Sequence, residues 1–149
     1  MKKEEEFYKK AVSFRDYIEN TIITIDEIEN LITKLMDLYV SVINLEDRIP
    51  TETKYEDVPR VTVRLGKDIK NRYWEVFDPY KKEAPVGPTI KDDLDDIVHD
   101  LNKGIWEYEN DSVDNAVFTW KEFHAFHWGN HVVDLLRALH AIRLSHYYD

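Results

Sequence analysis

The 149-residue sequence contains no cysteine, only four glycines and no long uninterrupted apolar run. The absence of cysteine excludes disulfide bonds, thiolate zinc sites and cysteine nucleophiles. The glycines are scattered and form no phosphate-binding loop, and no GxSxG nucleophile motif is present. The longest apolar region, residues 35–45, is interrupted by Asp37, Ser41 and Asn44, so it is too short and too polar for a membrane span.

Basic residues are also scarce, because 20 Lys and Arg stand against 30 Asp and Glu, a formal net charge of −10. This excess of acid disfavours nucleic-acid binding, since nucleic-acid phosphates repel it. The first six residues, MKKEEE, lack the apolar stretch of a secretory signal, so we expect a cytoplasmic protein that does not associate with membranes. The remaining composition, 43% hydrophobic and 13% aromatic, suits one packed domain over residues 1–149.

Apolar residues recur at helical spacing in the first third of the chain. A first helix carries its apolar face at Phe7, Ala11, Phe14 and Ile18. A second helix is predicted to begin at a capping box, Thr24 to Glu27, and to end before Pro50. Its apolar stripe is broad enough to contact neighbours on more than one side, so we expect it to be the central helix.

The middle of the chain is less regular. Residues 46–60 are polar, contain two prolines and predict a loop. Apolar residues then return at steps of four over residues 61–77, which predicts a third helix, although Val61–Val63 also suits a short strand. Residues 81–88 contain two prolines and a glycine and predict a second loop.

Two further helices are predicted in the last 60 residues. The fourth begins at a Thr89 cap, and the last begins at a Ser112 cap and runs to about Ser145. Gly129 is the position at which the last helix would kink or divide, by allowing another helix or a ligand to approach the backbone. The predicted fold class is therefore all-α, a bundle of about five helices with a long C-terminal helix.

The last predicted helix holds four of the six histidines. His127 and His131 are one turn apart, the spacing at which helical histidine pairs chelate a metal, and the fourth helix offers carboxylates opposite them. Such donors suit zinc, iron, nickel or manganese. The candidate metal ligands are His127, His131, Asp134, His124, Asp96 and Asp100.

The same pattern has a structural interpretation, in which His127 and His131 are buried, neutral and hydrogen-bonded to Asp96, Asp100, a tyrosine or backbone groups, and fix the register of two helices. A pocket for a ligand without metal is a third interpretation. Because Trp128 follows His127, the HExxH motif of zinc proteases is absent.

Three segments of the sequence are similar to a known family. HWGNHVVDLLRALH, residues 127–140, resembles the HWGxHxxDxLRALH signature of an uncharacterised bacterial family, domain of unknown function 5063. YWEVFDPY at residues 73–80 and DDLDDI at residues 92–97 resemble further blocks of that family in the same order. The resemblance implies a small all-helical cytoplasmic protein and supplies no activity. It points to His127, Trp128, Gly129, His131, Asp134, Arg137 and His140.

These features predict a non-catalytic binding or accessory module, whose His- and Trp-rich last helix lines a partly polar cleft. The residues expected at this cleft or at a partner surface are Tyr73, Trp74, Asp78, Tyr80, Trp120, Trp128, Arg137 and His140. One alternative is a metal-binding protein or metal-dependent hydrolase that uses His127, His131 and a carboxylate. Another is an acidic protein that neutralises a basic protein partner. The sequence is compatible with a monomer or a homodimer.

Overall fold

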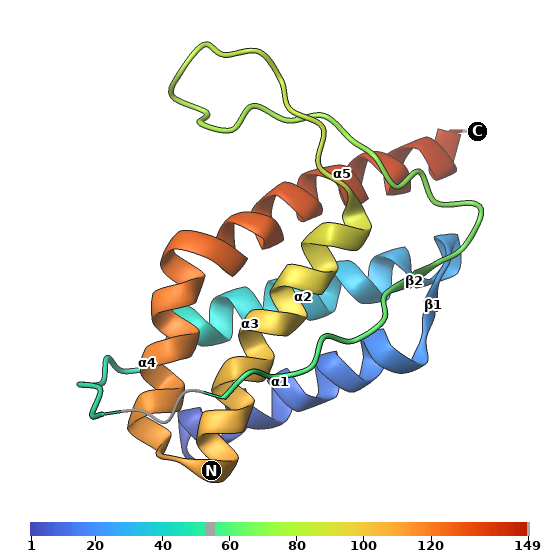
Figure 1. Cartoon of the computed structure of the whole chain (residues 1–149). Helices are drawn as coiled ribbons and strands as arrows, with labels where there is room; N and C mark the ends of the chain where they lie inside the picture. Colours follow the sequence, from blue (N-terminus) through green and yellow to red (C-terminus); the bar gives the residue numbers. More distant parts are fainter. Residues whose placement is uncertain (53–55, 149) are drawn as a thin grey trace.

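The computed structural model describes residues 1–52 and 56–148, which form a bundle of helices (Figure 1). Three helices are α1 (Lys3–Asn20), α2 (Ile28–Ile43) and α3 (Ile90–Asn110). A continuous C-terminal run consists of α4 (Val113–Phe123), a π-helical turn (His124–Trp128) and α5 (Gly129–Tyr148). The all-α fold with a long C-terminal helix is therefore confirmed.

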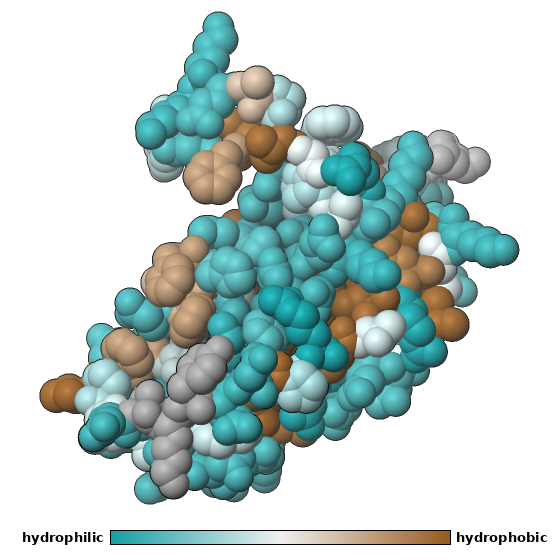
Figure 2. All heavy atoms as spheres, viewed as in Figure 1, coloured by the Kyte–Doolittle hydropathy of each residue, from teal (hydrophilic) through white to brown (hydrophobic). Residues whose placement is uncertain are grey.

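The helices share one hydrophobic core. α1 packs against α2 and α3, α2 packs against α5, and α3 packs against α4, α5 and the π-helical turn. The apolar face predicted for α1 is buried as expected, and it lies beside the corresponding face of α2. Figure 2 shows that hydrophilic residues cover much of the visible face, with patches of hydrophobic residues among them.

The central helix is α3, so the expectation that α2 occupies this position is wrong. α2 leaves Met36, Val40 and Ile43 exposed on the side away from the core. α3 buries its apolar face and also several polar residues, namely Asp93, Asp100, Asn102 and Glu107. These polar residues make α3 look like a surface helix in the sequence although it lies inside the bundle.

The predicted helix over residues 61–77 is also wrong. Residues 44–52 and 56–89 belong to a long crossover along the bundle, and these described residues include one short strand, the two-residue β2 (Arg64–Leu65) (Figure 1). β2 pairs in parallel with β1 (Ile22–Ile23). The amide of Tyr73 donates to the carbonyl of Pro88 at 3.1 Å, and Asn71 accepts from the amide of Ile90 at 2.9 Å. Backbone groups that a helix would pair within itself are therefore paired with other segments.

The helix caps decide where several elements begin. The side chain of Thr89 accepts a hydrogen bond from the amide of Asp92, and that of Ser112 accepts from the amide of Asn115, each at 3.1 Å. Both predicted caps are therefore confirmed. The capping box at Thr24 is wrong, because a 3₁₀ turn (Ile25–Glu27) precedes α2 and the Glu27 carboxylate accepts from the Tyr17 hydroxyl at 2.6 Å.

The C-terminal run bends at the π-helical turn, as Figure 1 shows between α4 and α5. The amide of Gly129 donates to the carbonyl of His124, five residues earlier, which is the hydrogen bond of a π-helix. A Cβ atom on residue 129 would lie 2.3 Å from that carbonyl oxygen. The predicted division at Gly129 is thus present, but the group that approaches the glycine belongs to the turn itself and not to another helix or a ligand.

Two buried tryptophans make hydrogen bonds that connect α4 to α3 and the π-helical turn to α4. The indole of Trp120 donates to the carbonyl of Leu101 at 3.0 Å, and the indole of Trp128 donates to the carbonyl of Trp120 at 2.9 Å. A Cβ atom on Gly104 would lie 2.1 Å from Nε1 of Trp120. Only glycine lets this ring lie so close to the backbone of α3.

Within the described residues, none of the helices has both the length and the apolar composition needed to cross a membrane.

We expect Gly104→Ala and Gly129→Ala each to lower the free energy of unfolding by about 2 kcal/mol or more, because the added methyl group overlaps a buried ring or a backbone carbonyl. Urea denaturation followed by circular dichroism measures this loss. Gly87→Ala is the matched control, since its Cβ would meet the ring of the exposed Trp74, which can move. Equal stabilities for all three variants would contradict the close approaches described above.

Candidate functional site

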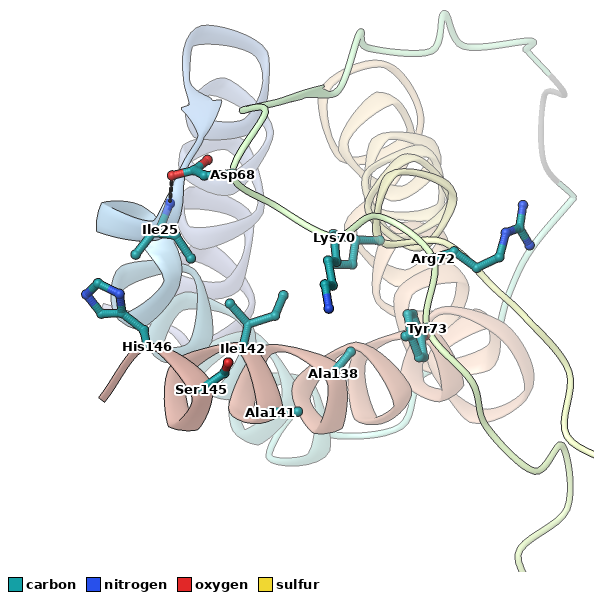
Figure 3. A pocket seen from close by; sticks show the side chains of 11 residues that line it. Ile25, Asp68, Lys70, Arg72, Tyr73, Ala138, Ala141, Ile142, Ser145 and His146 are labelled. Carbon is teal, nitrogen blue, oxygen red and sulfur yellow. Dashed lines mark hydrogen bonds between the residues drawn. The ribbon is translucent and has the colours of Figure 1, made fainter. Parts of the chain in front are cut away.

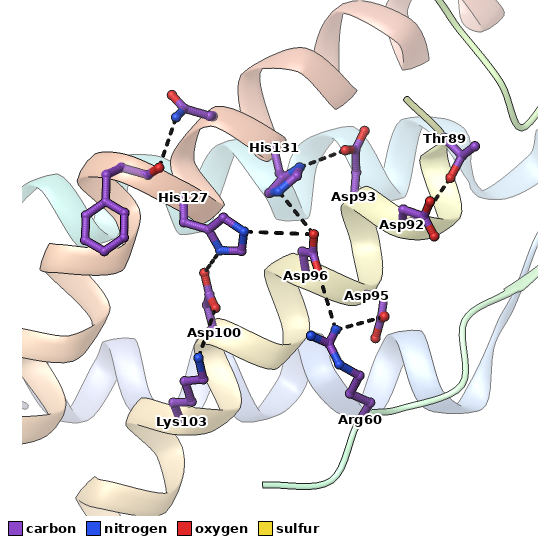
Figure 4. A network of polar contacts seen from close by, with 12 residues as sticks. Arg60, Thr89, Asp92, Asp93, Asp95, Asp96, Asp100, Lys103, His127 and His131 are labelled. Atoms are coloured by element: carbon purple, nitrogen blue, oxygen red, sulfur yellow. Dashed lines mark hydrogen bonds and ion pairs between the residues drawn. The ribbon is translucent and has the colours of Figure 1, made fainter. Parts of the chain in front are cut away.

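The candidate site lies between α3 and the C-terminal run (Figure 4). Asp93, Asp96 and Asp100 are three and four residues apart on α3, so they share one face of that helix. His127 lies in the π-helical turn and His131 in the first turns of α5, and both face these carboxylates. The site therefore depends on the packing of α3 against both segments.

Each histidine is oriented by its own buried aspartate. Nδ1 of His127 contacts Oδ2 of Asp100 at 2.5 Å, and Nδ1 of His131 contacts Oδ1 of Asp93 at 2.8 Å. Asp93 and Asp100 are only 2% and 1% exposed. A carboxylate accepts hydrogen bonds, so both Nδ1 atoms carry the proton and both Nε2 atoms are left for other contacts.

The two Nε2 atoms face the same oxygen of Asp96. Oδ2 of Asp96 lies 3.3 Å from Nε2 of His131 and 3.9 Å from Nε2 of His127. One ligand atom from each of the three residues lies within 4.8 Å of the others. The side chains of Asp96, His127 and His131 are 30%, 40% and 25% exposed, so the group is accessible from solvent.

The second oxygen of Asp96 is held by the crossover. Nη1 of Arg60 lies 3.3 Å from Oδ1 of Asp96 and 2.9 Å from Oδ2 of Asp95. Arg60 therefore contacts one side of the Asp96 carboxylate while the histidines lie at the other. This contact limits rotation of the carboxylate and keeps Oδ2 toward the imidazoles.

Tyr73 fixes Asp93 from the other side. Its hydroxyl donates to Oδ2 of Asp93, whose Oδ1 already accepts from His131. Burial, and then the contact with Asp93, raise the pKa of Tyr73 well above its ordinary value. The phenol therefore stays protonated and acts as a donor at neutral pH.

Burial and hydrogen bonds raise the pKa values of several groups at the site. Burial, and then its contact with Asp134, raise the pKa of Glu75 to about 7, and burial also raises the pKa of Asp134. Burial raises the pKa of Asp100, although the hydrogen bond from His127 opposes this. The hydrogen bond to Asp93 raises the pKa of His131 against the effect of burial. All four shifts are upward, so these groups retain their protons to a higher pH than they would in water.

A family model described as domain of unknown function (DUF5063) matches residues 2–145. The chain belongs to this family. No curated protein matches the chain. A crystal structure of protein BF1032 from Bacteroides fragilis is similar to it, with a TM-score of 0.72, 20% sequence identity and 96% of each chain covered. At this identity the likeness shows the shared fold alone.

The C-terminal residues that carry the resemblance to DUF5063 divide into four groups in the structure. His127 and His131 are the site histidines, while Trp128 and Gly129 build the bend beside them. Asp134 lies beside Glu75. The remaining two, Arg137 and His140, are exposed on α5.

The structure separates the six predicted metal ligands. It brings Asp96, His127 and His131 together, and it places Asp100 behind His127 as a hydrogen-bond partner. Asp134 contacts Glu75 instead of joining that group. His124 lies elsewhere, with its ring centroid 4.6 Å from that of Tyr39 and 4.7 Å from that of Trp128. The π-helical turn breaks the α-helical spacing that placed His124 on the same face.

The predicted cleft residues are likewise dispersed. Trp120 and Trp128 are fully buried in the core and line no cleft. Trp74 and Tyr80 are exposed on the projecting part of the crossover, where the Asp78 carboxylate accepts from the amide of Tyr80 at 3.0 Å. Tyr73 alone of this segment's predicted residues reaches the site, through its contact with Asp93.

Two residues of the site, Glu75 and Arg60, were not among the candidates, whereas Asp93 belongs to the carboxylates that the fourth predicted helix offers. The steps of three and four among Asp93, Asp96 and Asp100 signal that they share a helix face. No comparable signal exists for Glu75 and Arg60, because both lie in the irregular crossover. Their positions depend on tertiary contacts.

We expect Glu75→Gln to flatten the pH dependence of stability in chelator-treated protein. The folded pKa of Glu75 is about 7 and exceeds its ordinary value of 4.5, so the stability that this group contributes is fully present below pH 4.5 and is lost as the pH rises through 7. Urea denaturation between these limits and above pH 8 measures the decline. Glu83→Gln, on the exposed part of the crossover, should retain the wild-type profile; an unchanged profile for Glu75→Gln would contradict the prediction.

Proposed function

We propose that this protein is a metal-binding module that holds one divalent transition-metal ion through Asp96, His127 and His131. The observation that supports this most directly is the orientation of the two imidazoles. Each Nδ1 is engaged by its own buried aspartate, so both Nε2 atoms face the same oxygen of Asp96. Metal-bound histidines have the same outer hydrogen bonds, which fix the tautomer and raise the basicity of the ligating nitrogen.

The distances also support a metal ion. Ligand atoms about 2.1 Å from a tetrahedral ion lie about 3.4 Å from one another. The 3.3 and 3.9 Å separations between Asp96 and the two histidines are close to that value, so small rotations of the side chains would complete the geometry. Two imidazoles and one carboxylate suit zinc, iron, nickel or manganese, and the solvent-accessible side leaves room for water or another ligand.

In the structural interpretation, the same contacts hold two helices together and bind no metal ion. In that case a protonated His131 would bridge Asp93 and Asp96, and the pairs would hold α3 against α5 without metal. Pairs as exposed as those of Asp96 contribute little to stability. The geometric convergence on Oδ2 of Asp96 is therefore better explained by a shared ligand than by helix docking alone.

We expect about one metal ion per chain in untagged protein purified without chelator, or after incubation with zinc, iron, nickel or manganese, as measured by mass spectrometry. His131→Ala should lose the ion and should lower the melting temperature mainly relative to the metal-loaded wild type. His140→Ala, an exposed histidine of the same helix, is the control. Protein that stays metal-free after incubation, with His131→Ala equally destabilising with and without chelator, would establish the structural interpretation instead.

We expect Asp100→Asn to weaken metal affinity by about 10- to 100-fold, because it removes the charge that orients and polarises His127 without emptying its space. Competition with a chromophoric chelator measures this affinity. Asp95→Asn is the matched control, since Asp95 lies on the same helix and its carboxylate contacts Arg60 rather than a histidine. Equal affinities for both variants would show that Asp100 has no role in the site.

A second candidate function is metal-dependent hydrolysis, which one observation favours. A pKa of about 7 suits Glu75 to exchange protons at neutral pH, and the charge of His131 is near enough to lower that pKa. A water molecule bound to the ion could be activated in the same region. Metal-loaded protein should then hydrolyse p-nitrophenyl phosphate or acetate, and Glu75→Gln should retain the metal but lose this activity. If the metal-loaded protein hydrolyses neither substrate, the hydrolase proposal fails and metal binding is the remaining proposed function.

A further inference from the structure

A cavity of about 490 Å³ lies apart from the histidine group, between α5 and the last part of the crossover (Figure 3). Its apolar lining comes from α5, α3 and the turn before α2, and includes Ile25, Ile90, Ala138 and Ile142. Its size is within the range of small-molecule sites. The lining predicts that the larger part of any occupant is apolar.

The polar side of the cavity is dominated by one free cation. Lys70 extends from the crossover toward α5, so its ammonium group lies over the apolar lining (Figure 3). Within residues 1–52 and 56–148, Lys70 has neither an ion pair nor a hydrogen-bond partner. A lysine without a carboxylate partner can pair with an anionic ligand at no cost to an existing contact.

The other charged groups at the cavity already have partners. Oδ2 of Asp68 accepts from the amide of Ile25 at 3.2 Å. The guanidinium of Arg72 donates to the carbonyl of Gly87 and points away from Lys70. Of the lining groups with a permanent charge, Lys70 is therefore the one without a polar contact in the described residues, while the imidazole of His146 lies at another part of the lining.

We propose that this cavity binds a small amphiphile whose apolar body, of about eight to twelve carbons, lies against α5 and whose single anionic head group pairs with Lys70. The head group is a carboxylate or a phosphate monoester, because either anion pairs with an ammonium group.

The cavity is distinct from the proposed metal site but shares a wall with it. Ala138 lies seven residues after His131 on α5, about 10 Å along the helix. Tyr73 lines the cavity and donates its hydroxyl to Asp93, the partner of His131. The ligand therefore does not need the metal ion, and the two proposals can fail separately.

Amide NMR titrations of the chelator-treated full chain with decanoate, decyl phosphate and decylamine, each below its micelle concentration, test the proposal. We expect saturable shifts at Lys70, Ala141 and Ile142 with at least one of the two anions and none with the amine. Lys70→Met should weaken anion binding by about tenfold. Lys67→Met is the matched control, because Lys67 lies on the same segment and outside the lining.

Ala141→Trp tests whether the anions bind in this cavity. Ala141 is an exposed lining residue of α5, so a large ring there fills the cavity without disturbing the core. It should abolish binding of both anions while the spectrum stays folded. Asp96→Asn, which removes a proposed metal ligand, should bind the anions as wild type does. Preference for decanoate or decyl phosphate identifies the head group. Equal binding of decylamine, an unchanged Lys70→Met, or no saturable shift up to about 1 mM would overturn the proposal.

Discussion

The burial of two carboxylates on the central helix constrains much of this structure. Asp93 and Asp100 are almost fully buried, and a buried unpaired charge costs several kcal/mol. Both therefore need donors from the opposing segment, and His127 and His131 supply them. The donors come from a π-helical turn and from the helix after it, so the bend of the C-terminal run and the pairing of the carboxylates are parts of one arrangement.

The bend in turn depends on residues that carry no charge. Gly129 allows the carbonyl of His124 to approach its Cα, and Trp128 donates back to the carbonyl of Trp120 across the turn. Trp120 is itself fixed to α3 by the carbonyl of Leu101 and by the space at Gly104. The orientation of two polar histidines is thus determined by two glycines and two tryptophans in the core.

The sequence predicts those parts of the fold that depend on local chemistry. The apolar stripe of α1, the caps at Thr89 and Ser112, and the division at Gly129 can all be recognised from neighbouring residues. The crossover cannot, because its apolar residues recur at helical spacing while its backbone groups pair with distant segments. The site histidines and Asp96 could be predicted as candidates because they lie in segments with helical spacing. Glu75 and Arg60 could not, because they lie in the crossover.

The acidic residues of the candidate site make the buried position of α3 difficult to recognise from the sequence. A helix with Asp at four of five positions from 92 to 96 looks solvated, yet Asp93 points into the bundle because His131 and Tyr73 are there to donate to it. Tyr73 connects that carboxylate to the neighbouring cavity. Any group in the cavity that drew the phenol away from Asp93 would leave Oδ2 without this donor, and the more negative carboxylate would increase the basicity of His131, which contacts Oδ1. By linkage, a metal ion on His131 would change the affinity of the cavity by the same factor.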